Sequence, residues 1–123
     1  MRILALENSV MEQVLLTQAL PADSIVFCRT MESARSLLHR EATWDAVVID
    51  GILDDCVLYS DESAFRDFAA EAKQVARLVT LWLSIPPLHP IDWCHVLIKD
   101  ADDWDAAELK TFLRSLDESA GGN

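Results

Sequence analysis

Polar side chains follow four apolar segments of this sequence, and their chemistry is the first clue to function. Asp50, Ser84 and Lys99 each come directly after such a segment, and so do Glu7 and Asn8 near the start of the chain. In an open parallel sheet, ligands bind beyond the carboxyl ends of the strands, near the point where the strand order reverses. If the four segments are strands of one sheet, a carboxylate, a hydroxyl and an ammonium group gather at its ligand-binding edge.

The spacing of apolar residues predicts the elements that would hold these side chains. Short apolar runs alternate with longer amphipathic runs, which is the pattern of parallel βαβ units with helices on both faces of a sheet. The predicted strands are residues 2–6, 24–28, 45–49, 79–83 and 95–98. The predicted helices are residues 9–20, a stretch after Thr30, residues 61–78 and a stretch from about residue 102. The expected fold class is therefore α/β, with a doubly wound sheet of five parallel strands.

Local signals refine this expectation. Ser9 and Glu12 have the spacing of a capping box, in which each side chain satisfies a backbone N–H of the other. Thr30 is placed to cap the second helix. Residues 51–60 show no regular period and are expected to form a long loop. Residues 85–94 contain three prolines, which remove amide donors and exclude a long helix.

Length and composition limit the classes of function. A chain of 123 residues that is 51% apolar fits one domain, which we expect to cover residues 1–117, with residues 118–123 as a flexible tail or the start of a linker. The net charge of −11 would repel nucleic-acid phosphates. The sequence contains neither a membrane-spanning run nor a signal peptide, so we expect a cytoplasmic protein. The cysteines suggest neither a disulfide framework nor a zinc site; they are Cys28, Cys56 and Cys94.

The ordered polar ends resemble the receiver domain of two-component response regulators. The matching segments are RILALEN, DAVVID, VTLWLS and HVLIK, and the order of elements around them covers nearly the whole chain. The resemblance implies a flavodoxin-like fold in which Asp50 accepts a phosphoryl group, Ser84 donates a hydrogen bond to that group and Lys99 pairs with it. It also implies a magnesium ion held by Asp50 and by an acid pair after the first strand.

The sequence departs from that family at the metal site. Glu7 is one methylene longer than the usual Asp, and Asn8 offers a neutral carbonyl in place of a carboxylate. Magnesium requires oxygen ligands in near-octahedral geometry, so we expect a degraded site with weak or absent binding, and no resident cofactor. Asp54 and Asp55, in the following loop, are the alternative ligands.

Other departures affect the signalling elements. Asp54 and Asp100 stand where the family usually has prolines, and Val96 stands where many members carry an aromatic switch residue. Residues 85–94 are too few for the family's fourth helix, which we expect to be shortened or absent. Trp93 and Trp104 flank this altered segment, and aromatic residues are enriched in interface cores, so both are candidates for a partner surface.

These observations favour an atypical receiver, or pseudo-receiver, that acts by protein–protein interaction with weak or no phosphorylation and is not an enzyme. Its expected partner is a signalling protein or an output domain, or a second copy in a homodimer. The alternative is a receiver that is phosphorylated on Asp50 by a histidine kinase. Asp50 and Lys99 could also form a purely structural ion pair. A nucleotide or flavin carrier is poorly supported, because the sequence has no glycine-rich phosphate loop.

Overall fold

The structure is a computed structural model that describes residues 1–41, 43–99 and 106–121, with side chains as far as residue 116. Five parallel strands form one sheet: β1 (Arg2–Leu6), β2 (Ser24–Cys28), β3 (Trp44–Ile49), β4 (Ala76–Leu83) and β5 (His95–Ile98). The strand order β2-β1-β3-β4-β5 reverses direction between β1 and β3. The prediction of a doubly wound α/β fold is confirmed.

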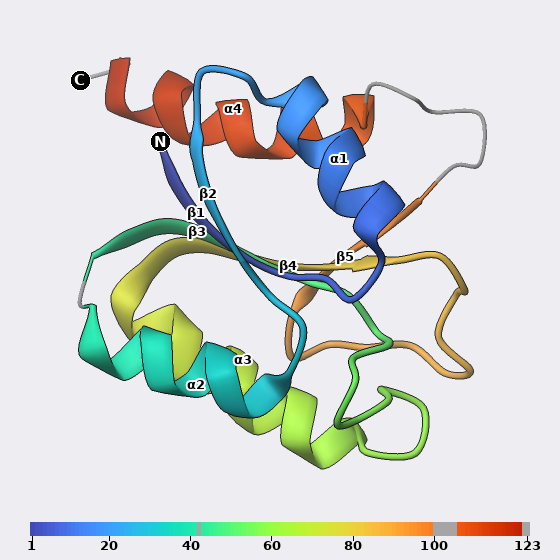
Figure 1. Cartoon of the computed structure of the whole chain (residues 1–123). Coiled ribbons are helices and arrows are strands. Elements are labelled where there is room, and N and C mark those ends of the chain that lie inside the picture. The colour runs from blue at the N-terminus through green and yellow to red at the C-terminus, as the bar shows by residue number, and fades with distance from the viewer. Residues whose placement is uncertain (42, 100–105, 122–123) are drawn as a thin grey trace.

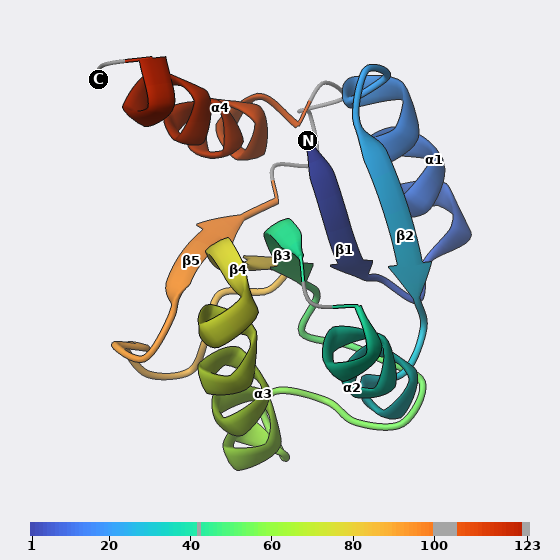
Figure 2. The same cartoon turned by 90° about the vertical axis from the view of Figure 1, so that its left-hand side faces the viewer.

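Helices cover both faces of this sheet (Figures 1 and 2). Helices α1 (Val10–Ala19) and α4 (Ala107–Gly121) lie on one face, and α2 (Met31–Arg40) and α3 (Glu62–Val75) lie on the other. The central strand β3 is buried on both faces, because Val47 and Ile49 belong to the core under α2 and α3 whereas Ala46 and Val48 belong to the core under α1 and α4. Among the described residues, no helix combines the length and the apolarity needed to cross a bilayer.

Most predicted boundaries hold, and the strands predicted at residues 2–6, 24–28 and 95–98 match the structure. The boundary between α3 and β4 was placed too late. Ala76 and Leu78 pair with Trp44 and Ala46 of β3, so these residues extend the sheet instead of the helix. An alanine on an apolar helical stripe fits either element, and strand pairing decides between them.

The last helix also begins later than predicted. It starts at Ala107, because Ala106 has a φ of 50° and therefore lies in the left-handed region, which an α-helix cannot include. The expected start near residue 102 falls among residues 100–105, outside the described part of the chain. At its other end α4 continues to Gly121.

The prediction that the fourth receiver helix is shortened or absent is confirmed: residues 84–94, between β4 and β5, contain no helix. The proposed caps are confirmed in part. Ser9 Oγ accepts from Glu12 N at 3.4 Å, and Thr30 Oγ1 accepts from Ser33 N at 3.1 Å. The reciprocal half of the capping box was wrong, because Ser9 N donates to Glu7 Oε1 and not to Glu12.

Candidate functional site

Three of the predicted site residues meet at the carboxyl edge of the sheet. The backbone of each continues the strand ladder by one residue, which fixes where its side chain starts. The three hydrogen bonds are Glu7 N to Cys28 O at 2.8 Å, Asp50 N to Leu6 O at 2.9 Å and Lys99 N to Leu83 O at 2.7 Å. The sequence prediction that these polar ends share one edge is therefore confirmed for Glu7, Asp50 and Lys99.

The ammonium group of Lys99 contacts three acidic side chains. Its Nζ lies 3.0 Å from Glu7 Oε2 and 3.3 Å from Asp50 Oδ1, and it also pairs with Glu12 Oε2. It lies 4.7 Å from the ring centroid of Trp82, in cation–π contact. The Lys99 side chain is only 9% exposed, so these contacts replace most of its hydration. We call Glu7, Glu12, Asp50 and Lys99 the lysine cluster.

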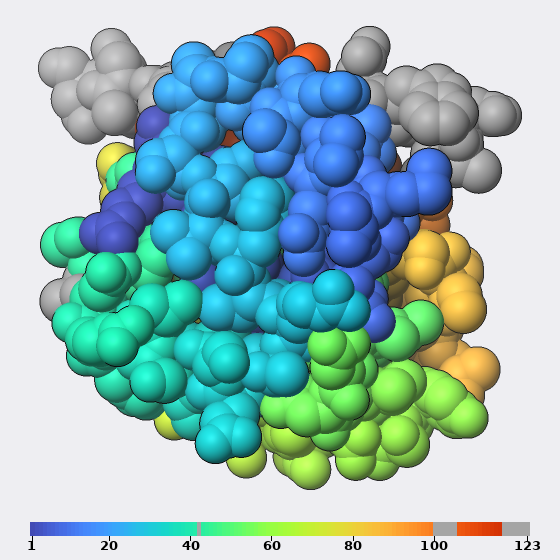
Figure 3. All heavy atoms as spheres, in the orientation of Figure 1, coloured from blue at the N-terminus to red at the C-terminus, as the bar shows by residue number. Residues whose placement is uncertain are grey.

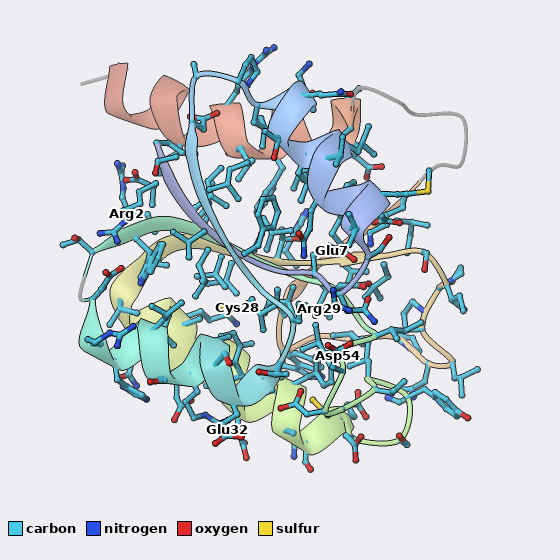
Figure 4. The ribbon with its side chains drawn as sticks, viewed as in Figure 1. Arg2, Glu7, Cys28, Arg29, Glu32 and Asp54 are labelled. Atoms are coloured by element: carbon cyan, nitrogen blue, oxygen red, sulfur yellow. The ribbon has the colours of Figure 1, made fainter. Side chains whose placement is uncertain are left out.

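Glu12 is the member of this cluster that sequence analysis missed. Its spacing from Ser9 identified it as a capping residue, but its side chain reaches Lys99 instead. The available signal was topological: α1 begins at the same edge at which β1 ends, so an acid in the first turn of α1 lies near Glu7. Figure 4 shows Glu7 at that junction, where β1 leads into α1.

Burial determines the electrostatics of the cluster. It raises the pKa of Glu7 from its ordinary 4.5 to about 8, a shift that the Lys99 ammonium opposes and the Asp50 carboxylate reinforces. Glu7 therefore carries a proton at neutral pH. Burial acts to lower the pKa of Lys99, but Asp50 and Glu7 outweigh it, so the pKa of Lys99 is raised and its ammonium stays charged.

This arrangement does not offer magnesium the ligands it prefers. Glu7 is protonated at neutral pH, Asp50 and Glu12 already neutralise Lys99, and Asn8 supplies only a neutral amide. Among the residues that the structure describes, no three His, Cys, Asp or Glu side chains are arranged to hold a metal ion.

The alternative ligands Asp54 and Asp55 are engaged elsewhere. Asp54 Oδ2 accepts from Arg29 Nε at 3.0 Å, and Figure 4 shows these two residues together. Asp55 caps α2, since its two carboxylate oxygens accept from the backbone N–H groups of Met31 at 2.7 Å and Glu32 at 3.1 Å. Partial burial acts to raise the pKa of Asp55, but these backbone donors outweigh it and hold the pKa below its usual value.

Ser84 lies on a different feature of the same edge. It is exposed and lines a cavity of about 410 Å³ between residues 51–59, which follow Asp50, and residues 84–91, which follow β4. The first of these segments is folded back on itself, because Leu58 N donates to Gly51 O at 2.8 Å. A Cβ on Gly51 would lie 3.0 Å from Leu83 Cδ2, so the absence of a side chain lets the segment leave the sheet edge closely packed. This cavity was not predicted.

Trp93 is half-buried and packs against the core. Its indole N–H donates to Glu62 Oε1 at 3.3 Å, and the same oxygen lies 3.0 Å from His89 Nε2. Lys73 Nζ donates to the Trp93 carbonyl. These contacts tie the proline-rich segment to α3, and a partner contact by Trp93 stays a prediction. Trp104 and Asp100 lie outside the described residues.

No protein-family model matches the chain, and no curated protein matches it. Solved structures with the same fold do match. One is the signal receiver domain of an HD domain-containing protein from Pseudomonas fluorescens Pf-5, with 19% identity, a TM-score of 0.72 and coverage of 99% of this chain and 98% of that chain. Another is the N-terminal domain of a response regulator/sensory box/GGDEF protein from Carboxydothermus hydrogenoformans, with 15% identity, a TM-score of 0.69 and coverage of 98% of both chains.

A third match comes from the complex of histidine kinase ThkA with response regulator TrrA, with 15% identity, a TM-score of 0.64 and coverage of 91% of this chain and 97% of that chain. The fold of this chain is thus the fold of response-regulator receiver domains, as the ordered polar ends predicted.

Proposed function

We propose that this domain is a pseudo-receiver of a signalling protein, which acts by binding another protein and takes up little or no phosphate. The observation that carries the proposal is the position of Lys99 Nζ, in contact with Glu7, Glu12 and Asp50. An ammonium group of the chain itself pairs with the carboxyl groups that a divalent cation would otherwise bind.

The electrostatics support this proposal. For magnesium to bind, Glu7 must lose its proton and Lys99 must leave a cluster in which its side chain is 9% exposed. Breaking a buried charge cluster costs several kcal/mol, which exceeds what a weak site regains. Phosphoryl transfer to Asp50 needs a cation to neutralise the developing charge, so the reaction should be slow.

The proposed role requires a protein partner and neither enzymatic activity nor a cofactor. We place the partner surface in the region that departs most from the receiver pattern, residues 85–104, and we assign the protein to the cytoplasm. The partner is a signalling protein or an output domain, with a second copy of the chain as the alternative occupant.

One observation favours a second candidate, a phosphorylatable receiver. Asp50 Oδ1 and Lys99 Nζ are 3.3 Å apart, and Ser84 follows the neighbouring strand at the same edge. If Lys99 moved from Glu7 and Glu12 to a phosphoryl group on Asp50, these three residues would have the roles that the resemblance implies.

A titration of the purified domain with magnesium, and then with beryllium fluoride as a phosphoryl mimic, separates the two candidates. Amide NMR shifts report on Asp50, Ser84 and Lys99, and the indole signal of Trp82 reports on movement of the ammonium group that lies over its ring. The pseudo-receiver predicts no saturable change. Saturable shifts that disappear in Asp50→Asn would instead establish a competent phosphorylation site and overturn the proposal.

A further inference from the structure

The cavity beside Ser84 is bordered by an apolar surface that extends beyond the cavity itself. Ile85 is 67% exposed and Leu88 is 83% exposed, and Ile52 and Tyr59 from the facing segment are also exposed. Figure 3 shows the facing segment in green beside the proline-rich segment in gold and orange, at the lower right of the molecule. Contiguous apolar patches larger than a few hundred Å² are rare on monomeric proteins and usually mark an interaction site.

The shape of this surface favours a protein segment over a small molecule. A small ligand is usually enclosed, with most of its surface buried in its pocket. Here Leu88 and Tyr59 line the cavity but remain 83% and 78% exposed, so a small ligand in the cavity would leave much of their surface in water. A peptide can fill the cavity with one apolar side chain and cover both rim residues with its neighbours.

Charge defines the chemistry of that segment. Within the described residues, Glu62 and His89 are the charged or readily charged groups that line the cavity, and no Lys or Arg lines it. The exposed Asp92 adjoins one lining segment and the exposed Asp61 adjoins Glu62. The whole chain carries a net charge of −11. A partner with basic residues beside its apolar anchor is therefore complementary, and an acidic partner is repelled.

The walls of the cavity are held in place before any partner binds. Residues 51–58 close through the hydrogen bond from Leu58 N to Gly51 O, and the proline-rich segment is tied to α3 through Glu62. Prolines restrict the backbone further. A preformed site loses less conformational entropy on binding than a flexible one.

We infer that this cavity and its rim bind an apolar segment of a partner protein that carries lysine or arginine next to its anchor. This inference deepens the proposed function, on which it rests, by naming the surface and the chemistry of its partner. The lysine cluster lies outside the lining of the cavity, although Gly51 joins the cavity directly to Asp50.

The test is a selection of random displayed peptides on the intact domain, run in parallel without and with magnesium and beryllium fluoride, followed by NMR mapping of the synthetic peptides. Binding is then compared in two pairs of variants. Ile85→Ser and Leu88→Ser alter the cavity rim, while Val10→Ser and Met11→Ser alter apolar residues of α1 that are similarly exposed, at 61% and 77%. Circular dichroism verifies that all four variants are folded.

The expected peptides combine apolar anchors with lysine or arginine and shift amides within residues 51–59 and 84–91. Their affinity should fall about tenfold in the rim variants and stay unchanged in the α1 variants. The inference would be overturned by peptides that are acidic or uncharged, by peptides that map to α1, by a failure to select any peptide under either condition, or by self-association of the domain through Ile85 and Leu88. If peptides bind this surface only in the presence of beryllium fluoride, the inferred binding surface stands, but the proposal that the domain acts without phosphorylation is wrong.

Discussion

The ammonium group of Lys99 lies 3.0 Å from Glu7 Oε2, although 92 positions separate the two residues in the chain. The sheet order brings them together, because β1 and β5 both end at the carboxyl edge of the sheet. The first turn of α1 begins at the same edge and places Glu12 beside Lys99. Lysine is usually held at a protein surface by its hydration. Here the Asp50 and Glu12 carboxylates, the protonated Glu7 carboxyl group and the Trp82 ring replace water around the ammonium group.

Lys99→Ala should therefore convert the domain into a magnesium-dependent one. Loss of the ammonium leaves the buried Asp50 carboxylate, and the partly exposed Glu12 carboxylate, without a counter-charge, which should lower the free energy of unfolding by about 3–5 kcal/mol. Millimolar magnesium should restore part of this loss, and more of it as the pH rises, because Lys99 lowers the pKa of Glu7 and its removal keeps Glu7 protonated to higher pH. Urea denaturation with and without magnesium chloride measures both effects.

Lys73→Ala is the control for this prediction, because Lys73 is exposed and lies on α3, away from the cluster. Its free energy of unfolding should not respond to magnesium, and neither should that of the wild type. A wild-type domain that magnesium stabilises as strongly as Lys99→Ala would show that the ammonium does not occupy the place of a cation.

Glu7 should make the stability of the domain depend on pH. Its pKa in the folded chain is about 8, raised above the ordinary 4.5, so the folded state binds more protons than the unfolded state between these values. The contribution of Glu7 is fully present below about pH 4.5 and is lost as the pH rises through about 8. The free energy of unfolding should therefore fall by a few kcal/mol across this window.

Glu7→Gln tests that slope, because glutamine has the shape of the protonated acid and does not titrate. The variant should lose most of the slope. Its amide has one acceptor oxygen where Glu7 uses both, toward Ser9 N and Lys99 Nζ, so it should be less stable than the wild type at low pH, and this difference should shrink as the pH rises through about 8. Glu108→Gln, on the exposed side of α4, is the matched control and should keep the wild-type slope. An equal slope in all three proteins would assign the pH dependence to other groups.

The sequence predicted the fold because its strands are short apolar runs with clear ends, such as residues 2–6 and 95–98. It predicted that Glu7, Asp50 and Lys99 would gather because parallel strands end at one edge. It did not predict the role of Glu12, because the Ser9–Glu12 spacing satisfies a local capping rule and says nothing about Lys99. It did not predict the cavity either, because residues 51–59 and 84–91 are irregular and their packing depends on tertiary contacts.

Asp55→Ala should destabilise the domain more than Asp54→Ala, although the two residues are neighbours. Asp55 accepts from two backbone N–H groups at the first turn of α2, and losing such a cap costs about 0.5–2 kcal/mol. Asp54 forms an exposed ion pair with Arg29, and such pairs contribute about 0–1 kcal/mol. Thermal unfolding of both variants measures the difference, and a larger loss in Asp54→Ala would contradict the capping role.

The hydrogen bond from the Trp93 indole N–H to Glu62 should help to hold the proline-rich segment, residues 85–94, against α3. Trp93→Phe keeps a ring against the core but removes the donor to Glu62 Oε1, a loss of about 1 kcal/mol. The segment should then open more often, so that thermolysin cleaves faster before Leu88 and Ile91, which mass spectrometry can follow.

Trp44→Phe is the matched control for that experiment, because Trp44 Nε1 is buried and no described residue accepts a hydrogen bond from it. Removing this N–H breaks no hydrogen bond and even relieves an unsatisfied donor. Cleavage within residues 85–93 should therefore stay at the wild-type rate in Trp44→Phe and increase in Trp93→Phe. Equal cleavage in both variants would mean that ring packing, and not the bond to Glu62, holds the wall of the cavity in place.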